Sequence, residues 1–452
     1  MNIINKIMSR FGFGKENTVD DTADISKLDT AVSATMRTHT EIWWNAFQNR
    51  LPKQPTHENF RVLPMVKLST SYIARLVTSE FKYELTDEAL NDYVKKNLLP
   101  KMDRIVQYAL IGGYSVIKPY IKPNGAIFFD HASSRSFLPQ ALDENGNITE
   151  GTFRQLIRYN KKTYERREHH RYADGVHYIT NTAWLYGTSQ QVQLSDIPVW
   201  AGILENGAIP SDMPLIVTYR MPYINNIDLD SPLPVSIYAG SIDTLHEINV
   251  AYSEYLAEFR KKSAKVFGDN SIFSKDGKIT DDYFINVHGD GVRSVDEQIM
   301  SYSPDIREAD LKAGLDTQFR LYESQLGVST GTFSFDTRKG LVTATQVLSE
   351  DKTTYDTIKQ LQAQLKPALE ALAHVTAILA QYYGMDATDE PPAIEFGDSV
   401  FEDTGTEFNR RMQLAQAGML KPELVNAWYF GVPEDKAREM LPDMAQTFGG
   451  DE

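Results

Sequence analysis

The sequence predicts an α+β fold, with a strand-rich region in its first half and long helices in its second half. Between residues 120 and 235, short apolar runs alternate with Asn-Gly, Asp-Gly and Pro, which are turn signals. After residue 241, apolar residues recur at helical spacing over long stretches. At 452 residues the chain exceeds the usual size of one hydrophobic core, so we expect two or more structural units.

The first half opens with a polar stretch, residues 1–40, that we expect to form an N-terminal arm and a solvated helix. It contains four closely spaced aspartates: Asp20, Asp21, Asp24 and Asp29. From about 41 to 120, apolar residues recur at three- and four-residue steps, which predicts helices. The pair Gly112-Gly113 predicts a helix end, and the β-branched run after it predicts a strand. Further strands are expected at 126–129, 152–159, 176–181 and 215–219.

The second half begins with an amphipathic pattern from Ser241 to Phe259, which predicts a long helix. A basic cluster closes this helix: Arg260, Lys261, Lys262 and Lys265. Cations are favoured at a helix C-terminus, so this position alone does not distinguish a helix end from a nucleic-acid contact. A small strand-rich segment is expected from about 267 to 305, and a second helix from about 307 to 326.

A loop rich in Gly, Ser and Thr follows at 327–340, before the longest helical pattern of the chain, about 344–383. This helix would span about 60 Å, and Pro367 should kink it. A short strand is expected at 393–396, and then a final pair of helices split by Gly418 and Gly431.

The composition excludes several kinds of chemistry. The chain has no cysteine, so disulfides, thiolate metal sites and cysteine nucleophiles are excluded. No apolar run approaches the roughly 20 residues that span a bilayer, so no membrane partner is expected. The net charge of −15 argues against a protein that grips DNA over a broad surface. Either no nucleic acid binds, or DNA slides past without adhering.

Motifs for catalysis are weak throughout the sequence. Gly12-Phe13-Gly14-Lys15 is too short for a phosphate-binding loop. The segment 327–331 fits Gly-x-Ser-x-Gly around Ser329, but a helical pattern precedes it where a nucleophile elbow needs a strand. Asp228 and Asp230 flank a predicted turn. The histidines His169, His170 and His177 have no spaced carboxylate, and we assign them to a surface loop. We therefore expect no enzyme, no metal and no cofactor.

One stretch resembles a known family. Residues 326–336, Leu-Gly-Val-Ser-Thr-Gly-Thr-Phe-Ser-Phe-Asp, and residues 343–347, Thr-Ala-Thr-Gln-Val, are similar to the tunnel-loop region of phage portal proteins. The resemblance is to portals of tailed double-stranded DNA bacteriophages of the siphovirus type, as in phages of Gram-positive hosts. Gln346 stands where the family usually has Glu, and Leu341-Val342 precedes the Thr.

The resemblance implies a portal fold: an α+β wing, a two-helix stem, a small β-rich clip, a tunnel loop with a long kinked helix, and a helical C-terminal crown. The implied boundaries are an arm at 1–40, wing at 41–239, stem helices at 240–266 and 305–326, clip at 267–304, tunnel loop at 327–343, long helix at 344–384, a strand returning to the wing at 385–403, and crown at 404–452.

The resemblance also implies a function. The chain would form a ring of twelve subunits at one capsid vertex, a conduit for genome packaging, retention and ejection. Its partners would be double-stranded DNA, the terminase large subunit, a head-tail connector, and the major capsid and scaffold proteins. It would reside in the virion and, during assembly, in the host cytoplasm.

The family mechanism assigns roles to three groups of residues. The DNA-facing tunnel-loop residues would be Thr330, Thr332, Ser334, Asp336, Thr337, Arg338 and Lys339. The basic cluster at 260–265 would face the channel or a neighbouring subunit. Terminase and connector would dock on the clip, at Lys275, Asp276, Lys278, Asp281, Asp282, His288 and Asp290.

Two other functions stay open. The first is another head-tail connector or minor head protein, which would share the composition. The second is a metal-dependent DNA-processing enzyme that uses Asp228, Asp230 and the histidines.

Overall fold

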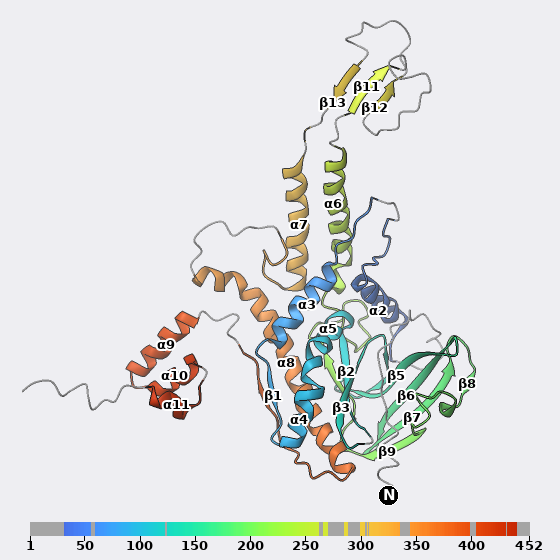
Figure 1. The fold of residues 1–452 in the computed structure, drawn as a ribbon, viewed down its shortest axis with the longest axis vertical. Coiled ribbons are helices and arrows are strands. Elements are labelled where there is room, and N and C mark those ends of the chain that lie inside the picture. The colour runs from blue at the N-terminus through green and yellow to red at the C-terminus, as the bar shows by residue number, and fades with distance from the viewer. Residues whose placement is uncertain are drawn as a thin grey trace, which may run out of the picture.

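The computed structural model describes residues 31–55, 59–122, 124–261, 265–269, 284–287, 299–302, 305, 307–334, 344–397, 404–430 and 432–440. Figure 1 shows a body of helices and sheets, from which two long helices project toward a small sheet. Three short helices from the C-terminal part lie beside the body. The observed mixture of helices and strands confirms the predicted α+β class.

Helices from the first part of the chain form one side of the body. They are α2 (Ala34–Phe47), α3 (Met65–Thr78), α4 (Glu88–Asn97) and α5 (Met102–Gly112). Side chains cap two of them: Ser33 accepts from the Met36 N–H, and Asp87 accepts from the Leu90 N–H. The helix α2 begins inside the stretch assigned to an arm. It is not a solvated helix, because Trp43 and Trp44 are buried.

A three-stranded antiparallel sheet lies at the centre of the body. Its order is β10 (Val217–Arg220), β2 (Tyr114–Ile121), β3 (Ile127–Ser133). The central strand β2 is buried along nearly its whole length and contacts α5 and the long helix α8 (Ala344–Tyr382). Gly113 joins α5 to β2 with a φ of +85°, and a Cβ there would lie 2.3 Å from the Pro234 carbonyl oxygen. Only glycine fits this junction, which confirms the predicted helix end.

A second, larger sheet is antiparallel. Its strands are β4 (Phe137–Leu142), β5 (Ile148–Tyr159), β6 (Lys162–Ala173), β7 (Val176–Leu185) and β8 (Gln191–Val192), with β9 (Asn206–Pro210) paired to β7. Positive φ angles at Asn160-Lys161 and Asp174-Gly175 make two tight hairpin turns. The strand β6 was not predicted. The assignment of its histidines to a surface loop was wrong, because His170 and His177 lie buried in β6 and β7.

The helix α8 crosses the body and buries one apolar stripe, which includes Leu361, Leu365, Leu369 and Leu372. The Tyr83 hydroxyl donates to the Leu369 carbonyl at 2.9 Å. Beyond α8, β14 (Ala393–Glu395) pairs with β1 (Lys82–Glu84), so the chain returns to the body next to the strand that follows α3. The predicted helix and strand are confirmed. The helix continues through Pro367, and the kink there stays a prediction.

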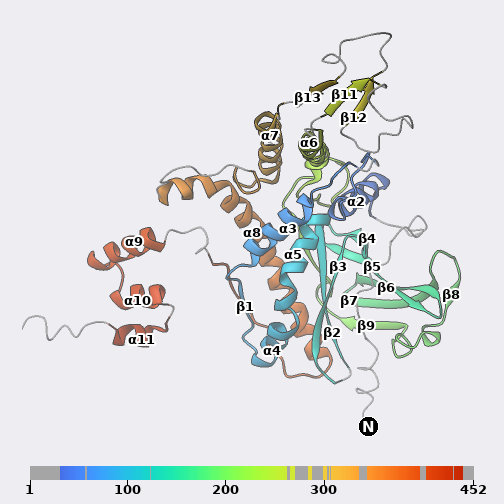
Figure 2. The ribbon, with the colours of Figure 1, turned by 45° about the horizontal axis from the view of Figure 1, so that its top comes forward.

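The two projecting helices are α6 (Ile242–Lys261) and α7 (Glu308–Leu326), which pack side by side (Figures 1 and 2). At their far end lies a sheet of β12 (Phe284–Val287), β11 (Lys265–Asp269) and β13 (Ile299–Tyr302). Both predicted helices and the strand-rich segment are confirmed. However, Lys265 begins a strand and does not end the helix, so the basic cluster is divided between two elements.

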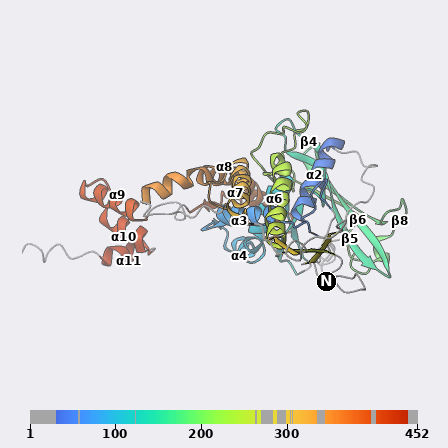
Figure 3. The same ribbon diagram turned by 90° about the horizontal axis from the view of Figure 1, so that it is seen from above.

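The described residues from 404 onward form three helices where two were predicted. They are α9 (Thr404–Gln416), α10 (Pro422–Phe430) and α11 (Glu434–Glu439), and they lie apart from the body (Figure 3). Gly418 has a φ of +72° and ends α9. Short 3₁₀ turns occupy Leu99–Lys101, Leu194–Asp196 and Ala239–Ser241.

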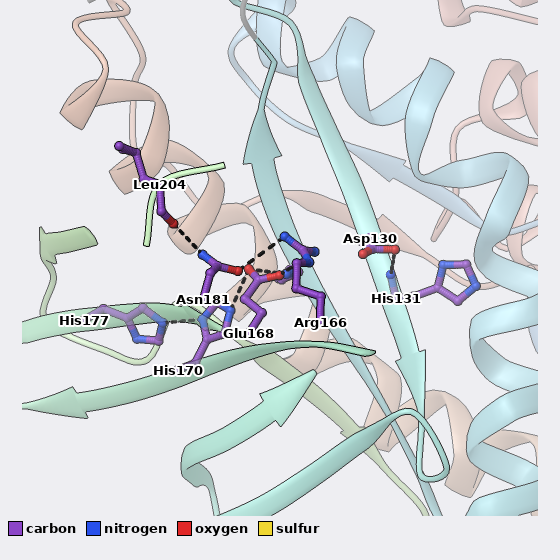
Figure 4. Close-up of polar contacts among 9 residues, drawn as sticks. Asp130, His131, Arg166, Glu168, His170, His177, Asn181 and Leu204 are labelled. Atoms are coloured by element: carbon purple, nitrogen blue, oxygen red, sulfur yellow. Dashed lines mark hydrogen bonds and ion pairs between the residues drawn. The ribbon is translucent and has the colours of Figure 1, made fainter. Parts of the chain in front are cut away.

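A chain of buried polar side chains crosses the large sheet (Figure 4). The Leu215 N–H donates to His177 Nδ1 at 3.2 Å, so His177 carries its proton on Nε2. That proton is donated to His170 Nδ1 at 2.8 Å, and His170 Nε2 donates in turn to Glu168 at 3.0 Å. Both rings are therefore neutral in this arrangement, and a further proton on either ring breaks one of these bonds.

Two cations lie at the Glu168 end of this row of hydrogen-bonded side chains. Lys118 and Arg166 pair with the Glu168 carboxylate at 2.5 and 3.2 Å, and all three side chains are buried. Burial raises the pKa of Glu168, but the two cations lower it further, to a value well below its ordinary range. Burial lowers the pKa of His170 to about 4, although its bond to Glu168 acts in the opposite direction. Burial also lowers the pKa of His177 well below its ordinary value.

These histidines predict that the protein loses stability in mild acid. In the unfolded chain His170 becomes protonated below about pH 6.5, whereas in the folded protein it stays neutral until about pH 4. Lowering the pH through this range therefore favours the unfolded state. We expect the free energy of unfolding to fall by about 2 kcal/mol from this residue between pH 7 and pH 5. Denaturant unfolding at several pH values measures this slope.

The matched control is His169→Gln, because His169 lies next to His170 and contacts Glu150 instead of the buried chain. His170→Gln should make the pH dependence less steep by the share of His170, while His177 keeps its own share, and His169→Gln should keep the full slope. Equal slopes in both variants and in the unsubstituted protein would contradict the assignment.

Candidate functional site: the loop between α7 and α8

The predicted tunnel loop connects α7 to α8, and the structure describes its first eight residues, 327–334, here called the loop base. The helix α7 ends at Leu326 because Gly327 takes a left-handed φ of +69°. The Val328 N–H then donates to the Glu323 carbonyl at 3.0 Å. A Cβ on Gly327 would lie 2.7 Å from the Thr357 hydroxyl, so glycine also permits the close approach of α8.

The Glu323 carboxylate of α7 accepts hydrogen bonds from the backbone of the loop base. It accepts N–H groups from Gly331 at 3.0 Å, from Phe333, and from Ser334 at 2.7 Å. The Ser334 hydroxyl donates to it as well, at 3.2 Å. Glu323 is fully buried, and no ion pair of this residue is found in the described part of the chain. Hydrogen bonds to an ionised carboxylate are stronger than neutral ones, so this single side chain fixes the backbone of residues 331–334.

Two threonines of α8 form hydrogen bonds with the first residues of the loop base. The Ser329 N–H donates to the Thr354 hydroxyl at 2.8 Å, and the hydroxyls of these two residues lie 3.0 Å apart. The Thr357 hydroxyl donates to the Gly327 carbonyl at 2.6 Å. These contacts join residues 25 to 30 positions apart in the sequence, so the two ends of the loop region are fastened to each other.

An aromatic contact adds a third attachment. The Phe333 ring packs edge-on against Tyr72 of α3, with the ring centroids 5.8 Å apart. It also lies 6.4 Å from the ring of Tyr322, whose hydroxyl is 2.8 Å from that of Ser69. The loop base is therefore fixed to α3, α7 and α8 together.

The predicted DNA-facing residues divide into two groups. Thr330, Thr332 and Ser334 lie in the loop base, and of these only Thr330 is exposed. The Thr332 hydroxyl donates to the Ser329 carbonyl within the loop base, and the Ser334 hydroxyl donates to Glu323 of α7. Asp336, Thr337, Arg338 and Lys339 lie outside the described residues.

Sequence reasoning missed Glu323, the residue on which the loop base depends. A signal was present, because Glu323 falls on the buried stripe of α7 with Phe319, Tyr322 and Leu326 at helical spacing. A carboxylate on an apolar stripe needs donors, and the Gly/Ser/Thr loop just after the helix supplies them. Thr354 and Thr357 gave no comparable signal.

The basic cluster and the clip are described only in part. Arg260 contacts the Asn59 side chain at the far end of α6. Lys261 ends α6, Lys265 begins β11, and Lys262 lies outside the described residues. The predicted docking residues all lie outside them too: Lys275, Asp276, Lys278, Asp281, Asp282, His288 and Asp290.

The catalytic alternatives gain no support from the described residues. Ser329 follows a helix and its hydroxyl contacts Thr354, so it does not occupy a strand-to-helix elbow. Asp228 lies in a turn, as predicted, and accepts a bond from the Ser33 hydroxyl. Across the described ranges, no group of three or more His, Asp and Glu side chains is arranged to hold a metal.

Among the helices that the structure describes, none is both long and apolar enough to cross a membrane. No curated protein matches the chain. A protein family described as "Phage portal protein, SPP1 Gp6-like" matches residues 45–446 of the 452. This match spans nearly the whole sequence, including the loop base and the three helices that hold it. The chain therefore belongs to the phage portal protein family, whose members are structural proteins of the viral capsid.

Proposed function

We propose that this portal protein forms a ring of twelve subunits at one capsid vertex and conducts double-stranded DNA during packaging, retention and ejection. The observation that carries this proposal is the loop between α7 and α8. Its base is fixed to three helices, and its continuation contains Arg338 and Lys339 between a polar segment and Gly340. A fixed base with basic residues beyond it suits transient contacts to a phosphate backbone, without base reading.

The charge of the chain supports passage of DNA rather than capture. Twelve copies carry 12 × (−15) = −180 charges. An acidic wall repels phosphates, so DNA stays mobile while a few cations make brief contacts. We propose that terminase and the head-tail connector dock on the segment between α6 and α7, and that the motor's ATP chemistry belongs to terminase. The capsid and scaffold proteins complete the proposed partners.

Exposed apolar side chains support a ring. Leu68 of α3 is 51% exposed, Leu321 of α7 is 47% exposed, and Phe259 of α6 is 42% exposed. Large apolar side chains on the outside of helices gain free energy when a neighbouring subunit covers them. All three belong to helices at or next to the two-helix projection, so we place the subunit interface there.

The ring is tested by mass. Purified protein should form rings of about 12 × 51.2 kDa, or about 614 kDa, visible by electron microscopy. Leu68→Asp combined with Leu321→Asp should shift the mass toward the single chain, because two charges would lie in the interface. The control is Leu229→Asp, an exposed leucine in the turn 228–230. A stable monomer of the unsubstituted protein under assembly conditions would count against the ring.

The role of the loop base is tested by Glu323→Gln. The glutamine has the same shape but only one acceptor oxygen, and its NH₂ group faces N–H donors that need an acceptor. We expect rings to form and DNA packaging to fall roughly tenfold, since each charged hydrogen bond contributes about 1.5–3 kcal/mol. Glu308→Gln, an exposed change on the same helix, should package normally. Normal packaging by Glu323→Gln would show that the held loop base is unnecessary.

The proposed DNA contact is tested by neutralising Arg338 and Lys339 together to Gln. Rings should form as before, while packaging or retention of DNA should drop because the transient phosphate contacts are lost. Lys421→Gln with Lys436→Gln removes the same charge from two exposed positions, one just before α10 and one in α11, and serves as the control. If both double variants package DNA equally well, the loop does not contact DNA.

A further inference from the structure

A cavity of about 290 Å³ lies beside α2, where residues of that helix meet Phe137, Leu138 and Arg154 of the large sheet. Residues from five parts of the chain line it, so it is a feature of the folded body and not of one loop. Apolar walls come from side chains that include Met36, Phe137, Leu138 and Leu233. The volume exceeds what one or two water molecules need, and it is large enough for side chains of a peptide.

Three arginines line this cavity: Arg37 of α2, Arg135 between β3 and β4, and Arg154 of β5. Arg154 pairs with Glu165 at 2.5 Å, and Arg135 lies 3.5 Å from Glu41, which also lines the cavity. Glu165 is shared with a further arginine, Arg167, at 2.8 Å. Positive groups therefore outnumber negative groups at this site.

Two donors of these arginines have no acceptor. The Nε–H groups of Arg37 and Arg135 are buried, and neither has a hydrogen-bond partner among the residues that the structure describes. Leaving a buried charged donor without a partner is costly, so such groups point to a bound acceptor. The guanidinium geometry matches carboxylates and phosphates.

The apolar walls of the cavity favour the carboxylates of a peptide over an inorganic phosphate. An inorganic phosphate would make no use of Met36, Phe137 or Leu138, whereas a peptide that mixes acidic and apolar residues would bury both kinds of side chain. This chain contains such a sequence at residues 16–30, Glu-Asn-Thr-Val-Asp-Asp-Thr-Ala-Asp-Ile-Ser-Lys-Leu-Asp-Thr. The two residues that follow this sequence lie at the cavity: the Ala31 N–H donates to the Pro139 carbonyl at 3.1 Å, and Val32 lines the cavity.

We propose that this cavity is a binding site for the carboxylates of an acidic peptide with apolar neighbours, of the composition that residues 16–30 have. Arg37 and Arg135 bind the carboxylates through their Nε–H groups, and the apolar walls receive the adjoining side chains. The site is independent of the loop between α7 and α8, so its test does not depend on the proposed DNA conduit.

The test measures binding of a labelled peptide with the sequence of residues 16–30 by fluorescence anisotropy. The full chain is used in two forms, unsubstituted and with Asp20, Asp21, Asp24 and Asp29 changed to Asn. We expect the peptide to bind the Asn form, and Arg37→Gln or Arg135→Gln in that form to weaken binding roughly tenfold. Arg158→Gln, an exposed arginine of the same strand as Arg154, is the matched control.

The outcomes separate the sources of the peptide. Weaker binding to the unsubstituted chain than to the Asn form supports the site and identifies the chain's own residues 16–30 as its occupant. Equal binding to both forms, with loss on Arg37→Gln, supports the site and assigns it to an acidic segment of another protein. Circular dichroism should show that the arginine variants fold normally, because the two Nε–H groups bond no described residue and the Arg135–Glu41 ion pair is long, at 3.5 Å.

Two outcomes overturn the proposal. The first is peptide binding that does not change in Arg37→Gln and Arg135→Gln, or the absence of any peptide binding. Water would then be the hydrogen-bond acceptor of the two Nε–H groups. The second is binding of inorganic phosphate at millimolar concentration that Arg37→Gln or Arg135→Gln removes, with no measurable binding of the peptide, which would make the cavity a small-anion site.

Discussion

Burying the carboxylate of Glu323 costs free energy, and the backbone N–H groups of the following loop offset that cost. The carboxylate and the loop N–H groups each satisfy the hydrogen-bonding requirement of the other. The loop residues 331–334 form no strand or helix, so their N–H groups need an acceptor, and Glu323 is the acceptor that the fold provides. A carboxylate satisfied by several donors also specifies one backbone path. The geometry at the start of the loop between α7 and α8 follows from this side chain.

The same arrangement joins the parts of the molecule. α7 supplies Glu323, α8 supplies Thr354 and Thr357, and α3 supplies the ring of Tyr72. A displacement of α7 along its axis would therefore disturb its contacts with both α3 and α8. In our proposal, force from DNA on the loop reaches the body through these three helices, and the buried stripe of α8 against the central sheet resists it.

Much of the fold could be predicted from the sequence because apolar periodicity is strong where elements are amphipathic. The stripes of α6, α7 and α8 and the paired glycines after α5 were sufficient to predict those elements. The strand β6 was missed because its charged side chains are buried by pairing, as Glu168 is with Arg166 of the same strand and with Lys118 of β2. Periodicity cannot reveal partners that lie on other strands.

The site was predictable only in outline. Composition and order located the loop, but the contacts that hold its base join residues on three helices, and no local pattern contains them. Likewise, the helix pair expected after residue 404 proved to be three helices, because α11 is too short for a periodic pattern.

The central claim is that a loop with a fixed base meets DNA inside a ring. A reconstruction by electron microscopy of the assembled protein with double-stranded DNA in its channel tests it most directly. The account predicts that residues 327–334 keep their contacts with Glu323 and Thr354, and that Arg338 and Lys339 lie against the DNA backbone. A ring in which these two residues face away from the channel would contradict it.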